Sequence, residues 1–126
     1  MGRDTTTEVG ALGEAWAEQY LERRGLRTLA RNYRWRGGEI DLIMCEGEQT
    51  VAFIEVRYRA RQHLTTPEAT VDARKQRKLV LTAEHYLARH PMLSFESVRF
   101  DVIGLSGNLE RPQVTWLRDA FRANTW

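Results

Sequence analysis

The chain has 126 residues, of which 42% are hydrophobic, enough for one globular domain with its own core and too many for a disordered chain. No stretch approaches the roughly 18 apolar residues of a membrane span, and the first residues lack the apolar core of a secretory signal. The net charge of +2 does not by itself indicate a nucleic-acid partner. We expect a single domain over residues 1–126, in the cytoplasm.

The first expected element is a helix over about 8–24, which Gly25 ends. Its predicted core face follows from apolar residues at helical spacing, Val9, Leu12, Trp16 and Tyr20. Three strands follow, and the short turns between them favour an antiparallel meander. Their expected ranges are 27–35, 39–45 and 50–58.

A loop over about 60–70 separates these strands from a second helix, expected from Asp72 to about His90 because Pro91 ends it. Strands over 97–105 and 113–117 come next, and a C-terminal turn or helix is expected from Asp119. The element order is therefore α-β-β-β-α-β with one extra strand. This predicts an α/β fold in which helices flank a mixed sheet.

The second and third expected strands carry acids where apolar side chains would be usual. A three-residue turn at 47–49 pairs positions whose numbers sum to 96, so that Leu42 faces Ile54 and Ile40 faces Val56. The same register places Asp41 across from Glu55, where like charges about 5 Å apart at Cβ are destabilising. It also places Glu39 across from Arg57.

Two readings account for the opposed acids. A divalent cation such as Mg²⁺ binds two or three carboxylate oxygens and water. Alternatively, Arg57 pairs with Glu39 or Asp41 in a cross-strand ion network on a solvated face. The register alone leaves both open.

Basic residues are gathered in three clusters rather than spread evenly. Seventeen of the nineteen are arginines, and residues 23–36 hold six of them with no acid between. The other clusters are Arg57–Arg61 and Arg74–Lys78, and Trp35 and Tyr58 lie among the arginines. Arginine forks suit phosphate oxygens and aromatic rings stack on bases, so a nucleic-acid partner is expected. The alternative is that these arginines only cover solvated faces.

At "GEIDLIM" and "VAFIEVRYR" the chain resembles the PD-(D/E)xK nuclease superfamily, in which an Asp on one strand precedes Glu-x-Lys on the next. More closely, it resembles the YraN family of bacterial proteins. That resemblance runs from "GEAWAEQYLERRGL" through "KQRKLVLTAEHYLARH" to "WLRDAF". It implies a restriction endonuclease-like fold and a Mg²⁺- or Mn²⁺-dependent nuclease acting on DNA, branched or single-stranded. Resolvase-like relatives work with paired sites, which also implies a homodimer.

The resemblance implies roles for particular residues. Asp41 and Glu55 match the metal-binding acids, and the Val56 carbonyl is a further expected ligand. Glu14 matches an acid that acts through water on the metal, and Arg57 occupies the position of the catalytic lysine. The expected nucleic-acid contacts are Arg31, Arg34, Arg36, Arg59, Gln76 and Lys78.

Two further assignments are open. Gln76 lies near where relatives place a polar site residue, although Lys75 or Lys78 is an equal candidate for a phosphate contact. Asp101 is expected to support the sheet or to contact Arg99.

Arg57 departs from the superfamily pattern, because an arginine stays protonated and cannot act as a base. Two further functions therefore stay open. One is a nuclease-shaped protein that binds nucleic acid without cleaving it. The other is a protein-interaction module whose docking patch comprises Trp116, Phe121 and Trp126.

Overall fold

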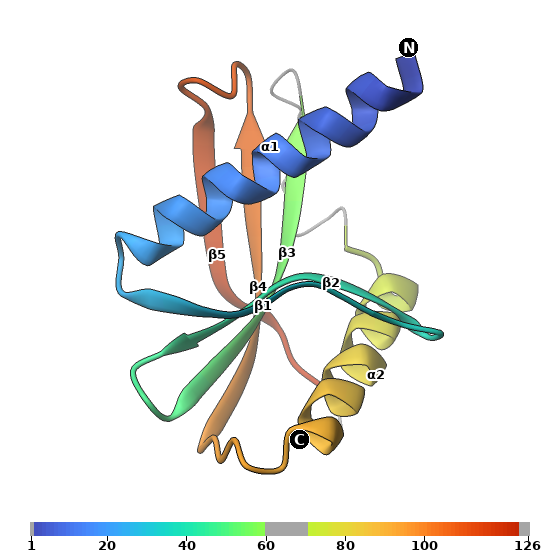
Figure 1. Ribbon diagram of the computed structural model, residues 1–126, viewed down its shortest axis with the longest axis vertical. Helices are drawn as coiled ribbons and strands as arrows, with labels where there is room; N and C mark the ends of the chain where they lie inside the picture. The colour runs from blue at the N-terminus through green and yellow to red at the C-terminus, as the bar shows by residue number, and fades with distance from the viewer. Residues whose placement is uncertain (1, 60–70, 124–126) are drawn as a thin grey trace.

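The structure, a computed structural model, describes residues 2–59 and 71–123, with side chains from Glu8 onward (Figure 1). The expected element order is confirmed. The elements are α1 (Gly2–Glu22), β1 (Leu26–Trp35), β2 (Gly38–Glu46), β3 (Thr50–Arg59), α2 (Ala73–Arg89), β4 (Ser97–Ser106) and β5 (Gln113–Phe121). The expected loop over 60–70 lies outside the described residues. Within the described ranges, no helix is both long enough and apolar enough to cross a membrane.

Two boundaries differ from the predictions. Helix α1 begins at Gly2 rather than at about residue 8. Strand β5 continues to Phe121, so the turn or helix expected from Asp119 is wrong. Asp119 has a φ of 56° and marks an irregularity between Phe100 and Val102 of the paired strand, beyond which β5 pairs with β4 again. A β-bulge of this kind interrupts a ladder without ending it.

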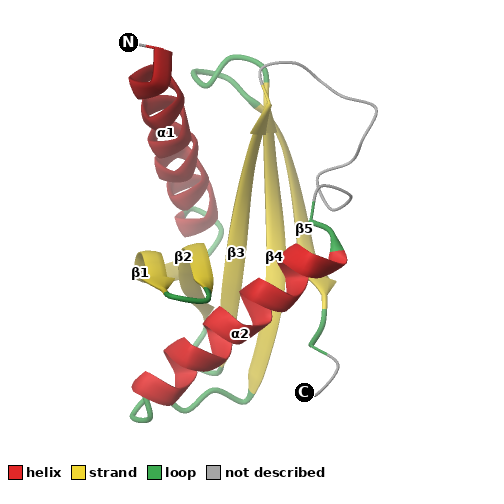
Figure 2. Ribbon diagram, turned by 90° about the vertical axis from the view of Figure 1, so that its right-hand side faces the viewer, coloured by secondary structure: helices red, strands yellow, loops and turns green. Residues whose placement is uncertain are grey.

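The five strands form one mixed sheet in the order β1-β2-β3-β4-β5. Neighbouring strands are antiparallel except β3 and β4, which are parallel. Parallel neighbours require a crossover connection, and α2 lies between them in the chain. The two helices cover opposite faces of the sheet (Figure 2).

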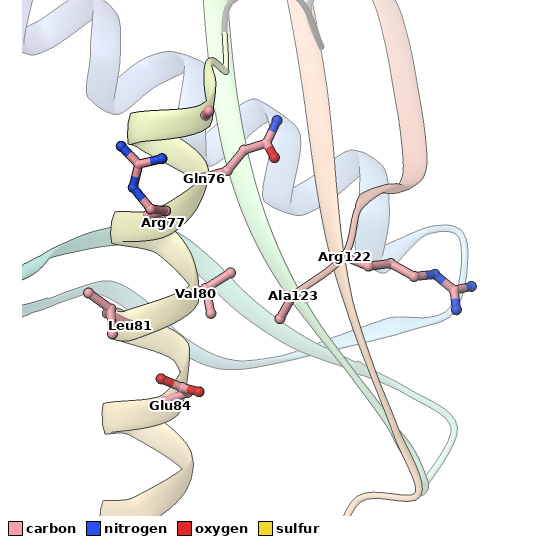
Figure 3. A pocket seen from close by; sticks show the side chains of 8 residues that line it. Gln76, Arg77, Val80, Leu81, Glu84, Arg122 and Ala123 are labelled. Atoms are coloured by element: carbon pink, nitrogen blue, oxygen red, sulfur yellow. The ribbon is translucent and has the colours of Figure 1, made fainter. Parts of the chain in front are cut away.

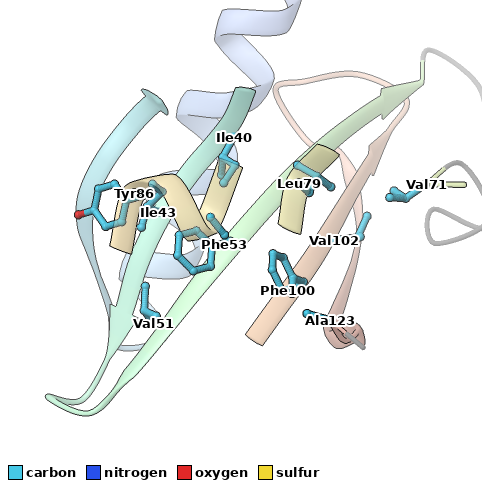
Figure 4. Packing of buried hydrophobic residues seen from close by; sticks show 11 residues of the cluster. Ile40, Ile43, Val51, Phe53, Val71, Leu79, Tyr86, Phe100, Val102 and Ala123 are labelled. Atoms are coloured by element: carbon cyan, nitrogen blue, oxygen red, sulfur yellow. The ribbon is translucent and has the colours of Figure 1, made fainter. Parts of the chain in front are cut away.

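The core has one apolar cluster on each face. On the α2 face, Val51 and Phe53 of β3 pack with Leu79 and Tyr86 of the helix (Figure 4). On the α1 face, the alternate β3 residues pack against Ala17 and Leu21. This alternation is what a strand buried on both faces requires.

The predicted core face of α1 needs correction. The buried stripe is formed by Gly13, Ala17 and Leu21, whereas Leu12 is 59% exposed. The larger Trp16 and Tyr20 flank this stripe and are only partly buried. Small side chains let a helix approach a sheet closely, and apolar spacing alone did not reveal this.

The β2–β3 register is confirmed over part of its length. Leu42 pairs with Ile54 and Met44 with Ala52, and Gly47 occupies the turn with a φ of 65°. Pairing ends at Leu42, so the predicted pair of Ile40 and Val56 does not form. Ile40 packs instead in the α2-face cluster.

Beyond that point β2 remains paired with β1 alone. We call residues 31–41 the β1–β2 extension; it diverges from β3, and its tip lies beside α2 (Figure 1). Trp35 fixes the tip by donating from Nε1 to Thr82 Oγ1 at 2.9 Å and stacking on His85 at 4.5 Å. Tyr33 Oη also lies 2.7 Å from His85 Nδ1. The tip of the extension is therefore attached to α2.

The predicted contact between Asp101 and Arg99 is confirmed. Asp101 is 1% exposed and accepts hydrogen bonds from Arg99 Nε, Trp116 Nε1 and the Asp119 N–H, at 2.9 to 3.1 Å. A carboxylate thus supplies the acceptor that the ladder lacks at the bulge. Asp101 supports the sheet.

Two of the three side chains expected to form a docking patch are engaged in the fold. Trp116 donates to Asp101, and Phe121 stacks on Phe100 with ring centroids 4.9 Å apart. Trp126 lies outside the described residues.

Candidate metal and nucleic-acid site

Asp41 lies at the point where β2 leaves β3. Its Oδ2 accepts a hydrogen bond from the Val56 N–H at 2.8 Å. This bond links the diverging strands one residue beyond Leu42 on β2 and two residues beyond Ile54 on β3, which form their last pair. The bend therefore brings the Asp41 carboxylate to β3 instead of carrying it away.

Glu55, the neighbour of Val56, is the second acid of the site, and its side chain is 6% exposed. Its Oε2 lies 3.1 Å from Arg57 Nη2 and 3.5 Å from Lys75 Nζ. Arg57 comes from the same strand, whereas Lys75 comes from the first turn of α2. A buried carboxylate needs such partners, because an isolated charge is strongly disfavoured away from water.

Glu55 lies close enough to Asp41 to affect the ionisation of Asp41. Burial, the largest cause, together with the charge of Glu55 raises the pKa of Asp41 to about 8. The Val56 N–H opposes this rise, while the charge of Glu14 and a hydrogen bond with Glu55 add to it. A carboxyl group held partly protonated near neutral pH is typical of a site prepared for a cation or for proton transfer.

The prediction that Glu39 lies across from Arg57 is wrong. Glu39 pairs with Arg34 of β1, with Oε2 and Nε 3.1 Å apart. The two residues face each other in the β1–β2 ladder. Because β2 has already diverged from β3, Glu39 has moved away from the acid pair.

Glu14 reaches the site from α1 through an intermediary. Asn32 Nδ2 donates to Glu14 Oε1 at 2.7 Å. Asn32 has a φ of 48° and lies between Arg31 and Tyr33, which pair with Leu42 and Ile40 on either side of Asp41. Glu14 thus lies near enough to raise the pKa of Asp41 by its charge.

A divalent cation fits this donor set in part. Within the described ranges, no group of three or more His, Cys, Asp or Glu side chains is arranged to hold a metal. Two carboxylates do meet, however, and Mg²⁺ is commonly held by one or two carboxylates, with water and substrate phosphate completing its shell. The structure shows Val56 meeting Asp41 through its N–H, and the Val56 carbonyl as a ligand stays a prediction.

The predicted nucleic-acid contacts fall in different settings. Arg36 is exposed near the tip of the β1–β2 extension, and Lys78 is exposed on α2, where its carbonyl lies beside Gly38 of that extension. Arg59 is partly buried at the end of β3. Arg34 is exposed but paired with Glu39. These four residues are on elements that border the acid pair.

Arg31, another predicted contact, is held by an acid of helix α1. Its Nε and Nη2 contact the two carboxylate oxygens of Glu18 at 2.8 and 2.7 Å. Thr28 Oγ1 also donates to Glu18. Arg31 therefore joins β1 to α1.

Gln76 lies beside the site, and its side chain contacts the Val71 carbonyl and lines a separate pocket. Its Nε2 donates to the Val71 carbonyl at 2.9 Å. It also lines a pocket of about 440 Å³ between α2 and the end of β5, together with Val80 and Ala123 (Figure 3). Lys75, the preceding residue, is the one that contacts Glu55.

The predicted site was thus incomplete in two respects. Asn32 was missed, although asparagine is among the residues that most readily adopt a positive φ and could have marked a break in the strand. Lys75 was named only as an alternative to Gln76. Its signal was a lysine in the first turn of a helix, where acids are usual.

Sequence comparison adds the chain's relatives. The profile of the "Uncharacterised protein family UPF0102" matches residues 13–105. The chain belongs to the UPF0102 family. It is 45% identical over 115 residues to the UPF0102 protein of Methylococcus capsulatus, covering 91% of each chain. It is 48% identical over 116 residues to that of Xylella fastidiosa, covering 91% of this chain and 93% of the relative.

A third relative, the UPF0102 protein of Xanthomonas campestris pv. campestris, is 50% identical over 113 residues, 90% of each chain. The UPF0102 match begins at Gly13, next to Glu14, and ends at Leu105 in β4. It therefore spans Glu14, Asp41, Glu55 and Lys75, and it leaves out β5.

Proposed function

We propose that this UPF0102 protein is a metal-dependent nuclease that hydrolyses phosphodiester bonds of DNA, branched or single-stranded. The observation that supports the proposal most directly is the meeting of Asp41 and Glu55 where β2 diverges from β3. Burial and the charge of Glu55 raise the pKa of Asp41 to about 8, and a bound dication would relieve the repulsion between the two acids.

Each side chain has a role that follows from its position. Asp41 and Glu55 would hold Mg²⁺ or Mn²⁺, which supplies a Lewis acid for phosphoryl oxygens and lowers the pKa of water. Glu14, steadied by Asn32, would orient the attacking water. Arg57 would place positive charge on the scissile phosphate.

Exposed cations on both sides of the acid pair would bind the nucleic-acid backbone. Arg36 lies on the β1–β2 extension and Lys78 on α2. Phosphate contacts of this kind position a substrate without reading its sequence. The proposal therefore concerns a structure-dependent rather than a sequence-dependent substrate.

Cleavage of labelled branched, flapped and single-stranded DNA in Mg²⁺ or Mn²⁺ tests the proposal. Asp41→Asn should lose cleavage while DNA binding persists. Glu39→Gln is the matched control, because Glu39 lies two residues away on β2 but pairs with Arg34, and it should cleave normally. Equal cleavage by the wild type and Asp41→Asn would identify a contaminant and remove the basis for the proposal.

One observation favours a second function, nucleic-acid binding without turnover. Glu55 already has two cations on one oxygen, Arg57 and Lys75. An acid neutralised in this way can act as a structural element. This function predicts salt-sensitive DNA binding that needs no metal and gives no product.

A further inference from the structure

The chain contains only two lysines, Lys75 and Lys78, among nineteen basic residues. Both lie near the start of α2, one turn apart. Lys78 is exposed, whereas Lys75 Nζ lies 3.5 Å from Glu55 Oε2, the oxygen that Arg57 also contacts. Of the two lysines, Lys75 is the one that touches the acid pair.

The position of Lys75 is unfavourable for its own helix. Helix α2 is capped by Asp72, whose Oδ1 accepts from the Lys75 N–H at 2.9 Å, and its first turn contains no acid. The N-terminus of a helix carries partial positive charge, so acids stabilise it and cations do not. Here Arg74 and Lys75 occupy that turn. A residue that breaks a local rule without local gain is a sign of function.

Glu55 provides the favourable electrostatic partner that Lys75 lacks within its own helix. Its carboxylate is almost fully buried and requires positive charge nearby. Arg57 meets part of that requirement from β3. Lys75 adds a second cation from α2, so the crossover helix supplies the lysine that strand β3, which has Arg57 at the motif position, lacks.

Lysine and arginine differ in the shape and flexibility of their charged groups. A lysine is a compact point charge on a flexible stem, whereas the arginine fork is rigid. We infer that Lys75 is the catalytic lysine of this site: its ammonium group balances Glu55 while no divalent cation is bound, and contacts the scissile phosphate once a cation occupies the carboxylates. This inference rests on the proposed function and adds the residue that the strand motif does not supply.

The chemistry needs no proton from Lys75. The water oxygen forms a bond to phosphorus, and the phosphorus–oxygen bond to the leaving strand breaks. The water proton passes to solvent and the leaving oxygen is protonated by solvent. Lys75 stabilises the negative charge on the non-bridging phosphate oxygens throughout.

Manganese titration without nucleic acid tests whether Lys75 balances the charge of Glu55 when no divalent cation is bound. Lys75→Met keeps the unbranched side chain but removes a charge near the proposed ligand oxygen. By calorimetry we expect it to bind Mn²⁺ about three- to tenfold more tightly than the wild type. Lys78→Met is the matched control and should stay within about twofold of the wild type, because its charge is exposed and screened.

DNA binding tests whether Lys75 contacts phosphate once a cation is bound, and this test does not depend on turnover. Affinity for single-stranded DNA is measured at constant ionic strength, in EDTA and in Ca²⁺. Lys75→Met should leave the affinity in EDTA nearly unchanged and weaken it about fivefold or more in Ca²⁺, since Lys75 reaches phosphate only when a cation holds Glu55. Lys78→Met should weaken binding equally in both.

The outcomes separate this inference from the proposed function. If the wild type binds no Mn²⁺, both are overturned. If it binds Mn²⁺ and Lys75→Met binds it no more tightly, Lys75 does not balance Glu55 and the inference alone is overturned. An equal loss of DNA affinity in EDTA and Ca²⁺ would also overturn it, by making Lys75 an ordinary phosphate contact.

Discussion

The Val56 N–H donates to Asp41 Oδ2 at 2.8 Å, just past the last paired position of β2 and β3. The Asp41 side chain therefore accepts a hydrogen bond from β3 at the point where backbone pairing between the strands stops. The bond holds Asp41 against β3 and beside Glu55. It is the contact on which the geometry of the acid site depends.

Replacing Asp41 by Asn should stabilise the metal-free protein. Asparagine keeps an acceptor for the Val56 N–H and removes a charge that burial and Glu55 disfavour. We expect the free energy of unfolding at pH 8 to rise by about 1 to 2 kcal/mol. Urea denaturation in EDTA measures the change, with Glu39→Gln as the control.

The effect of Asp41 also has a defined pH dependence. Its pKa in the folded protein is raised from 3.8 to about 8, so between these values the folded state binds more protons than the unfolded chain. The stability of the wild type should fall as pH rises through this window. Asp41→Asn should lack that contribution, so the difference should be largest at pH 8 and above. Parallel stability curves for the two proteins would contradict the assignment.

Glu18 should show the opposite behaviour. Hydrogen bonding from Arg31 lowers the pKa of Glu18, assisted by Thr28 and opposed by burial. Its contribution to stability should be complete above the unfolded pKa near 4.5 and lost as pH falls through the lower folded pKa. Glu18→Gln should cost about 1 kcal/mol at pH 7 and much less at pH 3. Urea denaturation at both pH values measures this, and Glu22→Gln, an exposed acid one turn on, is the control.

Asp101 should be the most sensitive polar position in the sheet. Asp101→Asn removes the charge that faces Arg99 and turns an amide group toward donors from Trp116 and Asp119. We expect the free energy of unfolding to fall by about 3 kcal/mol, as measured by thermal or chemical denaturation. Asp119→Asn is the control, because asparagine also adopts the positive φ found there. Equal effects of the two changes would show that the bulge, not the buried carboxylate, carries the stability.

Two arginines of the first basic cluster should differ in DNA binding. Arg36 is exposed, and Arg36→Ala should weaken binding and lower the slope of log affinity against log salt by about 1. Arg31 is held by Glu18, so Arg31→Ala should mainly lower stability. Fluorescence anisotropy over a range of salt concentrations distinguishes them. An equal change of slope in both variants would show that Arg31 leaves Glu18 to contact phosphate.

Much of the fold could be predicted because it is encoded locally. The turn at Gly47 sets the β2–β3 register, and the sum rule that follows from it is correct as far as Leu42 and Ile54. Helix α2 could be placed because its buried face and its end at His90 depend on nearby residues. These signals act over a few positions in the sequence.

The rest depends on contacts between distant residues. The divergence of β2 accompanies the contacts of Trp35 with Thr82 and His85, about fifty positions away in sequence. The continuation of β5 depends on Asp101, which caps the Asp119 N–H across the sheet. Asp41 and Glu55 could be predicted as neighbours, but the meeting of Glu55 with Lys75 arises from the placement of the crossover helix.

The seating of Trp35 on α2 has a mechanical consequence. The strand segment that carries Asp41 and the helix that carries Lys75 are joined by the same indole. The β1–β2 extension and α2 cannot separate at this point without breaking the contacts of Trp35. Under the proposed function, the spacing between the elements that carry Asp41 and Lys75 would thus be set before a nucleic acid binds.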